Sequence, residues 1–132
     1  MPAHESPLVR LERHARNRAL EVAVTEVRDG AWTSLTWNEL YRRVIDGAAG
    51  MIEAGVNPGQ VVVTRVATGV RQLELELATR VAGAVPLLLP EHLEQVEVGR
   101  LLDEVQVRLV VVDHESRLAR LRVRKIPLDA IP

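Results

Sequence analysis

Three apolar runs typical of β-strands alternate with helix-length segments through the middle of this chain. The runs "VVVTRVA", "AVPLLL" and "VRLVVVD" begin near Val61, Ala84 and Val107, and one helical segment separates each run from the next. Parallel strands need long crossover connections, which are almost always right-handed. The order therefore predicts an α/β fold with three layers, in which helices cover a mainly parallel sheet built from βαβ crossovers. A chain of 132 residues fits one domain over residues 1–132.

The segment "VRQLELELATRVAG" between the first two runs fits two kinds of secondary structure. Leucines alternate with glutamates in "LELEL" as in a strand, whereas Val70, Leu73, Leu77 and Val81 keep helical spacing. The middle of the segment lacks β-branched residues and is rich in Ala, Leu and Glu, which favours a helix. We expect a crossover helix that stops at Gly83.

A short helix and a β-hairpin are expected ahead of the sheet. Ser6 followed by Pro7 is a good helix start, because serine can cap free backbone N–H groups and proline is preorganised for the first turn. Apolar and polar residues then alternate over residues 20–27, and Asp29-Gly30 supplies a turn before "AWTSL". This pattern predicts a hairpin.

A capping box predicts the start of the next helix. In Thr36-Trp37-Asn38-Glu39, the threonine hydroxyl can accept a hydrogen bond from the Glu39 N–H while the Glu39 side chain reaches back to the cap. The helix should stop at Gly55, where a left-handed conformation costs glycine little. "NPGQ" then fits a tight turn into the first strand of the sheet.

The composition indicates a globular protein with an aliphatic core and excludes several kinds of chemistry. Hydrophobic residues make up 47% of the chain, but Phe is absent and the aromatic residues are two Trp and one Tyr, so Val, Leu and Ala must fill the core. The absence of cysteine excludes disulfides, thiolate nucleophiles and thiolate metal sites. The chain also lacks a bilayer-length apolar stretch and a signal-peptide pattern, so we expect a cytoplasmic protein without membrane insertion.

The net charge of −1 gives no indication of nucleic-acid binding. The chain is locally basic near its C-terminal end, at Arg117, Arg120, Arg122, Arg124 and Lys125. Such a cluster can contact phosphate, but no aromatic residues interleave with it to stack on bases. We therefore interpret it as a solvated face and expect no nucleic-acid partner.

Three loops are candidate positions for a binding or catalytic site, because ligands of parallel α/β sheets bind beyond the carboxyl ends of the strands. The loops "ATGV", "PEHLE" and "DHES" follow the three predicted strands. Their polar residues include Glu91, His92, Asp113, His114 and Glu115. A His–carboxylate pair or a metal site is geometrically possible there. Ordinary polar loop residues are the favoured interpretation, because no ligand spacing such as HExxH occurs.

The remaining motifs form no catalytic constellation. Thr68-Gly69 before a helix can direct backbone N–H groups at an anion, but neither GxxxxGK[ST] nor GxGxxG is present. No serine lies in a nucleophile elbow. We assign no catalytic, cofactor-binding or metal-ligating residue on these grounds.

The order of the segments resembles the beginning of the AMP-forming acyl-CoA and aryl-CoA synthetases and related adenylate-forming enzymes. "SLTWNELYRRVIDGAAGMIEAGVNPGQVVV" is similar to a stretch in which a Leu-Thr-aromatic-x-Glu-Leu helix start leads through a Gly-Val-x-Pro-Gly turn into a strand. "RVAGAVPLLLP" and "LLDEVQVRLVVVD" are similar to the segments that follow, and the resemblance covers residues 8–113. The matching positions are Leu35, Thr36, Trp37, Glu39, Leu40, Gly55, Pro58, Gly59 and Gly83. The tryptophan favours the long-chain acyl-CoA ligase branch.

The resemblance implies an enzyme that activates a carboxylate with ATP to an acyl-adenylate, usually before thioester formation with CoA. The family's phosphate loop, its adenine- and ribose-binding motifs and its catalytic lysine would all lie beyond Pro132, so no catalytic residue is carried over. ATP, Mg²⁺ and CoA are expected only if missing domains complete the enzyme. Two departures, "VATGVRQ" in place of a Pro-Asn/Ser turn and an early Pro86, affect the loops that support the substrate half.

Three functional hypotheses follow, in order of preference. The first is a truncated, non-catalytic domain that acts through protein contacts or self-association, because this part of a full enzyme packs on a second subdomain and would otherwise expose aliphatic surface. The second is one piece of a split AMP-forming acyl-CoA ligase completed by another chain. The third is a small anion- or metal-binding protein that uses His92, Asp113, His114 and Glu115.

Overall fold

Parallel strands form the central sheet of the protein. The structure, a computed structural model, describes residues 5–66, 69–89, 92–104, 109–112 and 124–127. The strands of this sheet are β3 (Val61–Arg65), β4 (Val85–Leu88), β5 (Leu109–Val112) and β6 (Arg124–Pro127). They lie in the order β4-β3-β5-β6, and every neighbouring pair is parallel. The predicted parallel sheet with crossovers is confirmed.

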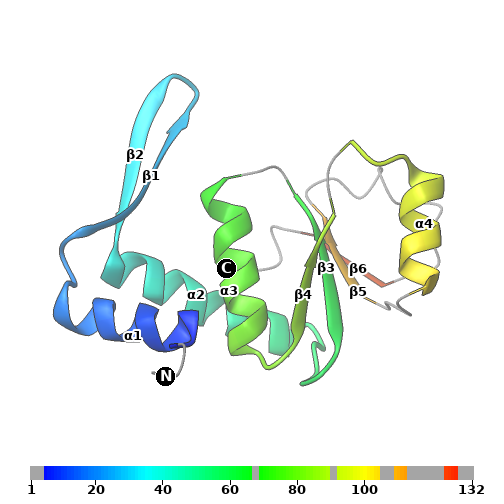
Figure 1. The fold of residues 1–132 in the computed structure, drawn as a ribbon, viewed down its shortest axis with the longest axis horizontal. Helices are drawn as coiled ribbons and strands as arrows, with labels where there is room; N and C mark the ends of the chain where they lie inside the picture. Colours follow the sequence, from blue (N-terminus) through cyan, green and yellow to red (C-terminus); the bar gives the residue numbers. More distant parts are fainter. Residues whose placement is uncertain (1–4, 67–68, 90–91, 105–108, 113–123, 128–132) are drawn as a thin grey trace.

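Helices cover both faces of this sheet, which gives the three layers expected from the sequence (Figure 1). The helices are α1 (Pro7–Asn17), α2 (Trp37–Glu53), α3 (Val70–Val81) and α4 (Gln95–Glu104). On one face, Val62 of β3 is buried with Met51 of α2 and Leu75 of α3, and on the other face Val63 is buried with Val98 of α4. The core is aliphatic, as the composition requires. No helix in the described ranges is long and apolar enough to cross a membrane.

Strand β4 lies at an edge of the sheet, and this position explains the proline within it. The Val85 N–H donates to Gln60 O at 2.8 Å, and the Leu89 N–H donates to Thr64 O at 3.0 Å. Because successive N–H groups of a strand point in opposite directions, the N–H that Pro86 lacks would point away from β3. Proline therefore removes no bond to β3 at this position.

A separate two-stranded antiparallel sheet, formed by β1 (Val22–Arg28) and β2 (Ala31–Thr36), confirms the predicted hairpin. Its turn is made by Asp29 and Gly30, whose φ angles of 52° and 77° are both positive, as the two-residue turn with this sequence requires. Figure 1 shows the hairpin as a long arm that projects away from the sheet.

The predicted caps begin the first two helices. The Leu8 N–H donates to Ser6 Oγ at 3.2 Å, and the Glu39 N–H donates to Thr36 Oγ1 at the same distance. The Glu39 carboxylate reaches back to the cap as predicted, where it accepts a hydrogen bond from the Thr36 hydroxyl at 3.0 Å. These local bonds fix the junction between β2 and α2.

The ambiguous segment "VRQLELELATRV" forms helix α3, but its buried face differs from the helical stripe visible in the sequence. Leu75 and Ala78 are buried together with Glu74 and Thr79, whereas Val81 is exposed. The buried stripe therefore includes a glutamate.

Candidate functional site

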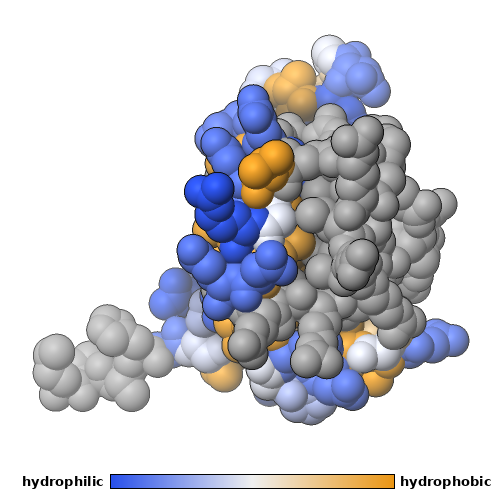
Figure 2. Space-filling view, turned by 90° about the vertical axis from the view of Figure 1, so that its right-hand side faces the viewer, coloured by the Kyte–Doolittle hydropathy of each residue, from blue (hydrophilic) through white to orange (hydrophobic). Residues whose placement is uncertain are grey.

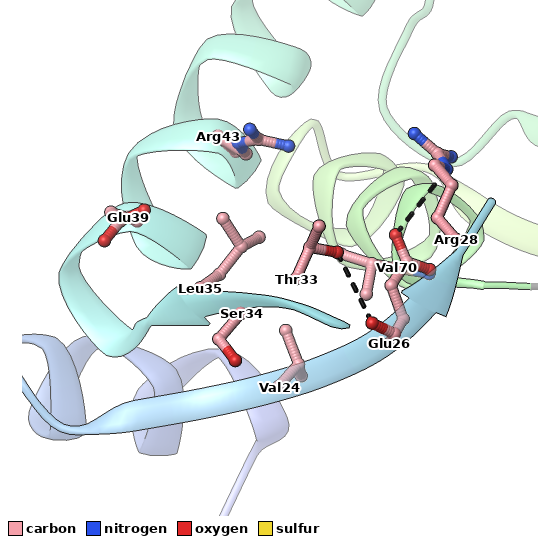
Figure 3. Close-up of a pocket in the computed structure, with 9 residues that line it drawn as sticks. All are labelled: Val24, Glu26, Arg28, Thr33, Ser34, Leu35, Glu39, Arg43 and Val70. Atoms are coloured by element: carbon pink, nitrogen blue, oxygen red, sulfur yellow. Dashed lines mark hydrogen bonds and ion pairs between the residues drawn. The ribbon is translucent and has the colours of Figure 1, made fainter. Parts of the chain in front are cut away.

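A cleft of about 320 Å³ lies between the β-hairpin and helices α2 and α3 (Figure 3). An adjoining hollow of about 340 Å³ extends it along the first turns of α3. The charged residues that line the two are Glu26, Arg28, Glu39, Arg43, Arg71 and Glu74. Equal numbers of acidic and basic side chains meet here, and several of them form ion pairs with one another.

Glu26 on β1 caps the N-terminus of α3. Its Oε2 accepts a hydrogen bond from the Val70 N–H at 3.1 Å, and its Oε1 lies 3.9 Å from Arg28 Nε. A Cβ on Gly69 would lie 2.9 Å from the same Oε2, so a side chain at this position would displace the carboxylate from its present place. A carboxylate at this position is stabilised by the free N–H groups and the dipole of the helix.

Glu74 holds helices α2 and α3 together from a buried position. Its side chain is 2% exposed, and its two oxygens lie 3.1 Å from Arg43 Nη1 of α2 and 3.1 Å from Arg71 Nη1 of α3. A buried charge is tolerated only when it is paired and hydrogen-bonded. Both carboxylate oxygens of Glu74 meet this requirement.

The arrangement favours a structural role for the cleft. The carboxylates of Glu26 and Glu74 are both held by donors of the protein itself. The N-terminus of α3, where a phosphate would gain most from the helix, already receives the Glu26 carboxylate. These contacts hold the hairpin, α2 and α3 to one another.

The carboxyl edge of the parallel sheet contains part of the predicted polar cluster. His92 is exposed there, while Glu91, Asp113, His114 and Glu115 lie outside the described residues. Arg65, at the end of β3, is 5% exposed and donates from Nη2 to Leu93 O at 2.6 Å, which ties the segment after β4 to the central strand. Among the described residues, no group of three or more His, Asp or Glu is placed to hold a metal ion.

Five of the positions that resemble the family lie at the junction of β2 and α2. Leu40 is buried at 3% exposure with Leu11 and Val44, and Leu35 and Trp37 pack against this cluster. The Trp37 ring lies 4.6 Å from the His14 ring, tilted by 54°. With the Thr36 and Glu39 cap described above, these positions attach the hairpin and α1 to the body.

The other family-like positions lie where turns enter the sheet. Gly59 and Gly83, with φ angles of 80° and 83°, precede β3 and β4, and the Gly59 N–H donates to Gly83 O at 2.8 Å. A Cβ on Gly83 would lie 3.4 Å from Pro58 Cβ. Gly55, with φ of 104°, follows α2 as the predicted helix stop. These turns lie at the amino ends of the strands, opposite the edge where ligands collect.

Sequence reasoning missed the residues that make the polar contacts of the cleft and of the end of β3. Glu26, Arg43, Arg65, Arg71 and Glu74 were not among the candidate residues, yet three of them form the pairing between α2 and α3. A weak signal was present: Glu74 is flanked by Leu73 and Leu75 on a helix whose apolar stripe is interrupted. Its basic partner on α2 has no local signal.

The sequence matches the AMP-binding enzyme family over residues 11–129, so the chain belongs to this family. It is 33% identical over 125 residues to malformin synthetase mlfA from Aspergillus tubingensis, which covers 92% of this chain and 2% of the synthetase. It is 30% identical over 116 residues to 2-methylpropanoate–CoA ligase CCL4 from Humulus lupulus, which covers 88% of this chain and 21% of the ligase.

A solved structure shares the fold. The N-terminal subdomain of NpsA from Klebsiella oxytoca superposes with a TM-score of 0.84 at 15% identity, over 95% of this chain and 31% of that chain. This agreement confirms the α/β fold class. The chain spans about a fifth or less of the length of the curated relatives it matches.

Proposed function

We propose that this chain is a scaffold segment of an adenylate-forming enzyme, without catalytic activity on its own, that acts through protein contacts. The observation that carries the proposal is the contact between the Glu26 carboxylate and the Val70 N–H at 3.1 Å. The protein's own carboxylate takes the helix end at which an anionic substrate would gain most. The pairing of Glu74 with two arginines supports the same interpretation.

In this proposal, ATP with Mg²⁺ and CoA are bound by parts of an adenylate-forming enzyme other than this segment. The positions that resemble the family lie at the β2–α2 junction and at the amino ends of β3 and β4. Residues in such places determine how elements pack and contribute no group to a reacting centre. We expect a cytoplasmic location for the protein, in keeping with the absence of cysteine.

Pyrophosphate release tests the proposal directly. The purified chain is incubated with ATP, Mg²⁺, CoA and a panel of fatty and aryl acids, beside an intact acyl-CoA ligase as the positive control. We expect no pyrophosphate above the rate without acid. Acid-dependent release by this chain alone, abolished by a core substitution that unfolds it, would refute the proposal.

The second candidate is one piece of a split AMP-forming ligase completed by another chain. It is favoured by the similarity to a CoA ligase of which this chain spans 21%. The discriminating experiment co-expresses the chain with the product of the adjoining downstream reading frame. Co-purification together with acid-dependent pyrophosphate release supports a split enzyme, whereas separate elution and no release supports the scaffold role. No grouping of described residues favours the metal-binding alternative.

A further inference from the structure

Strand β2 presents a free edge on the β-hairpin. Within the part of the chain that the structure describes, β2 is hydrogen-bonded to β1 alone. Ala31, Trp32, Thr33 and Ser34 are all exposed, and the Trp32 side chain is among the most exposed large apolar groups at 77%. Figure 1 shows that the tip of the hairpin extends beyond the helices. An isolated two-stranded hairpin is at best marginally stable and gains from further strands.

The turn determines which backbone groups face this edge. Arg28 and Ala31 flank a two-residue turn and therefore form a hydrogen-bonded pair, after which bonded and non-bonded pairs alternate along the ladder. Val27 opposite Trp32 and Thr25 opposite Ser34 are non-bonded pairs. The N–H and C=O groups of Trp32 and Ser34 thus point outward from β2. Those of Thr25 and Val27 point outward from β1.

Other edges of the fold carry features that discourage pairing with another strand. At the outer edge of β4, Pro86 stands where an outward N–H would be. The edge of β1 is interrupted by an irregularity between Val22 and Val24 and includes the charged residues Glu26 and Arg28. Prolines, bulges and charges are the means by which natural sheets protect their edges.

Strand β2 has none of these protections. Its sequence, AWTSLT, contains no charged residue and no proline, and its register with β1 is regular from Ala31 to Leu35. The surface over α4 differs from the edge of β2. Among the residues that Figure 2 colours there, most are hydrophilic and the apolar ones are scattered. An exposed and uncharged edge is the feature that predicts strand pairing between chains.

We propose that β2 pairs in antiparallel fashion with β2 of a second copy of this chain, which joins two hairpins into a four-stranded sheet. A twofold axis at Thr33 places Trp32 opposite Ser34 of the second copy, so that the outward groups of both residues meet. The two Trp32 rings then lie diagonally on one face, within reach of each other, and the two Thr33 side chains face each other on the opposite face.

Charge favours a second copy as the occupant of this edge. In a twofold antiparallel interface the residue on the axis meets its own equivalent, so a charged residue there faces a like charge. Because residues 31–36 carry no charge, β2 pairs with itself without that cost. The equivalent arrangement through β1 brings Glu26 and Arg28 of both copies to the contact.

This pairing deepens the proposed role in protein contacts, and the two can fail separately. Pyrophosphate release would refute the scaffold role and leave the pairing of hairpins untouched. A monomeric chain would refute the pairing, while a scaffold role that uses another partner would stand.

Sedimentation velocity of the 132-residue chain over a wide concentration range tests the pairing. We expect the mass to rise from the monomer value of 14.7 kDa towards twice that value. Tryptophan emission should shift to the blue over the same range, and the shift should be absent from Trp32→Phe.

Matched substitutions on the two strands of the hairpin identify the edge that is used. Ser34→Pro removes one outward N–H from β2, and Thr25→Pro removes the cross-strand equivalent from β1, with no backbone bond lost between β1 and β2 in either case. Both substitutions remove the same side-chain hydrogen bond, which joins Thr25 Oγ1 and Ser34 Oγ at 2.9 Å, so they are matched in this respect. We expect Ser34→Pro to be monomeric and Thr25→Pro to associate like the wild type. Ser34→Lys and Thr25→Lys give the same contrast if a proline unfolds the hairpin. A wild-type mass that stays at 14.7 kDa, or equal effects of the two lysines, overturns the proposal.

Discussion

Replacement of Glu74 by glutamine tests the polar link between α2 and α3. The substitution keeps the size of the side chain but removes its charge, and one amide N–H₂ then faces an arginine that can only donate. The wild-type carboxylate lies 3.1 Å from both Arg43 Nη1 and Arg71 Nη1, and it is 2% exposed. Burial therefore leaves the altered group no access to water as a substitute partner.

The magnitude follows from the exposure of the two arginines. Breaking a fully buried pair costs about 3–5 kcal/mol. Arg43 is 57% exposed and Arg71 is 25% exposed, so both can recover part of their hydration. We therefore expect Glu74→Gln to lower the free energy of unfolding by about 2–3 kcal/mol, in keeping with the loss of one to two hydrogen bonds to charged groups.

Urea unfolding followed by circular dichroism measures this change. The matched control is Glu76→Gln, two residues further along α3, whose carboxylate is 34% exposed and lies 3.5 Å from Arg80 Nη2. An exposed pair of this kind contributes about 0–1 kcal/mol. If Glu74→Gln and Glu76→Gln change the free energy of unfolding equally, the buried pairing does not link the helices as described.

Two further substitutions test the contact between the hairpin and α3 and the backbone conformation of the turn before β4. Glu26→Ala removes the cap of α3 and should lower the free energy of unfolding by about 1–2 kcal/mol, with faster hydrogen exchange at the Val70 N–H. Unchanged exchange at that amide would mean that the carboxylate does not cap the helix. At Gly83, with φ of 83°, thermal melting should show a larger loss for Gly83→Val than for Gly83→Asn, because asparagine tolerates positive φ and a β-branched residue does not. Equal melting temperatures for the two variants would contradict the positive φ.

Features that depend on neighbouring residues could be predicted from the sequence. The caps at Ser6 and Thr36, the Asp29-Gly30 turn and the stop at Gly83 are short-range requirements of the backbone. The parallel sheet followed from the spacing of apolar runs, because long crossovers between strands of this kind leave few alternatives. For the same reason, the resemblance to adenylate-forming enzymes was visible in the order of these segments, and the family match confirms it.

Two polar contacts between elements could not be predicted in this way, because each joins residues far apart in the chain. Arg43 and Glu74 are 31 positions apart, and Glu26 and Val70 are 44 positions apart. A glutamate in a helical segment looks the same in the sequence whether it faces water or another helix. Of the predicted cluster at the strand ends, only His92 lies within the described residues, and it is exposed.

The sequence by itself determined the elements, their order and the family, because backbone geometry and hydrophobic spacing act locally. Only the tertiary structure decided which charges are buried and which strand edge is left open. The N-terminus of α3 meets Glu26 because the hairpin folds against that helix, and β2 is an edge because no other described strand pairs with it. Both outcomes depend on how elements pack in space, and packing distances are not encoded in any single segment.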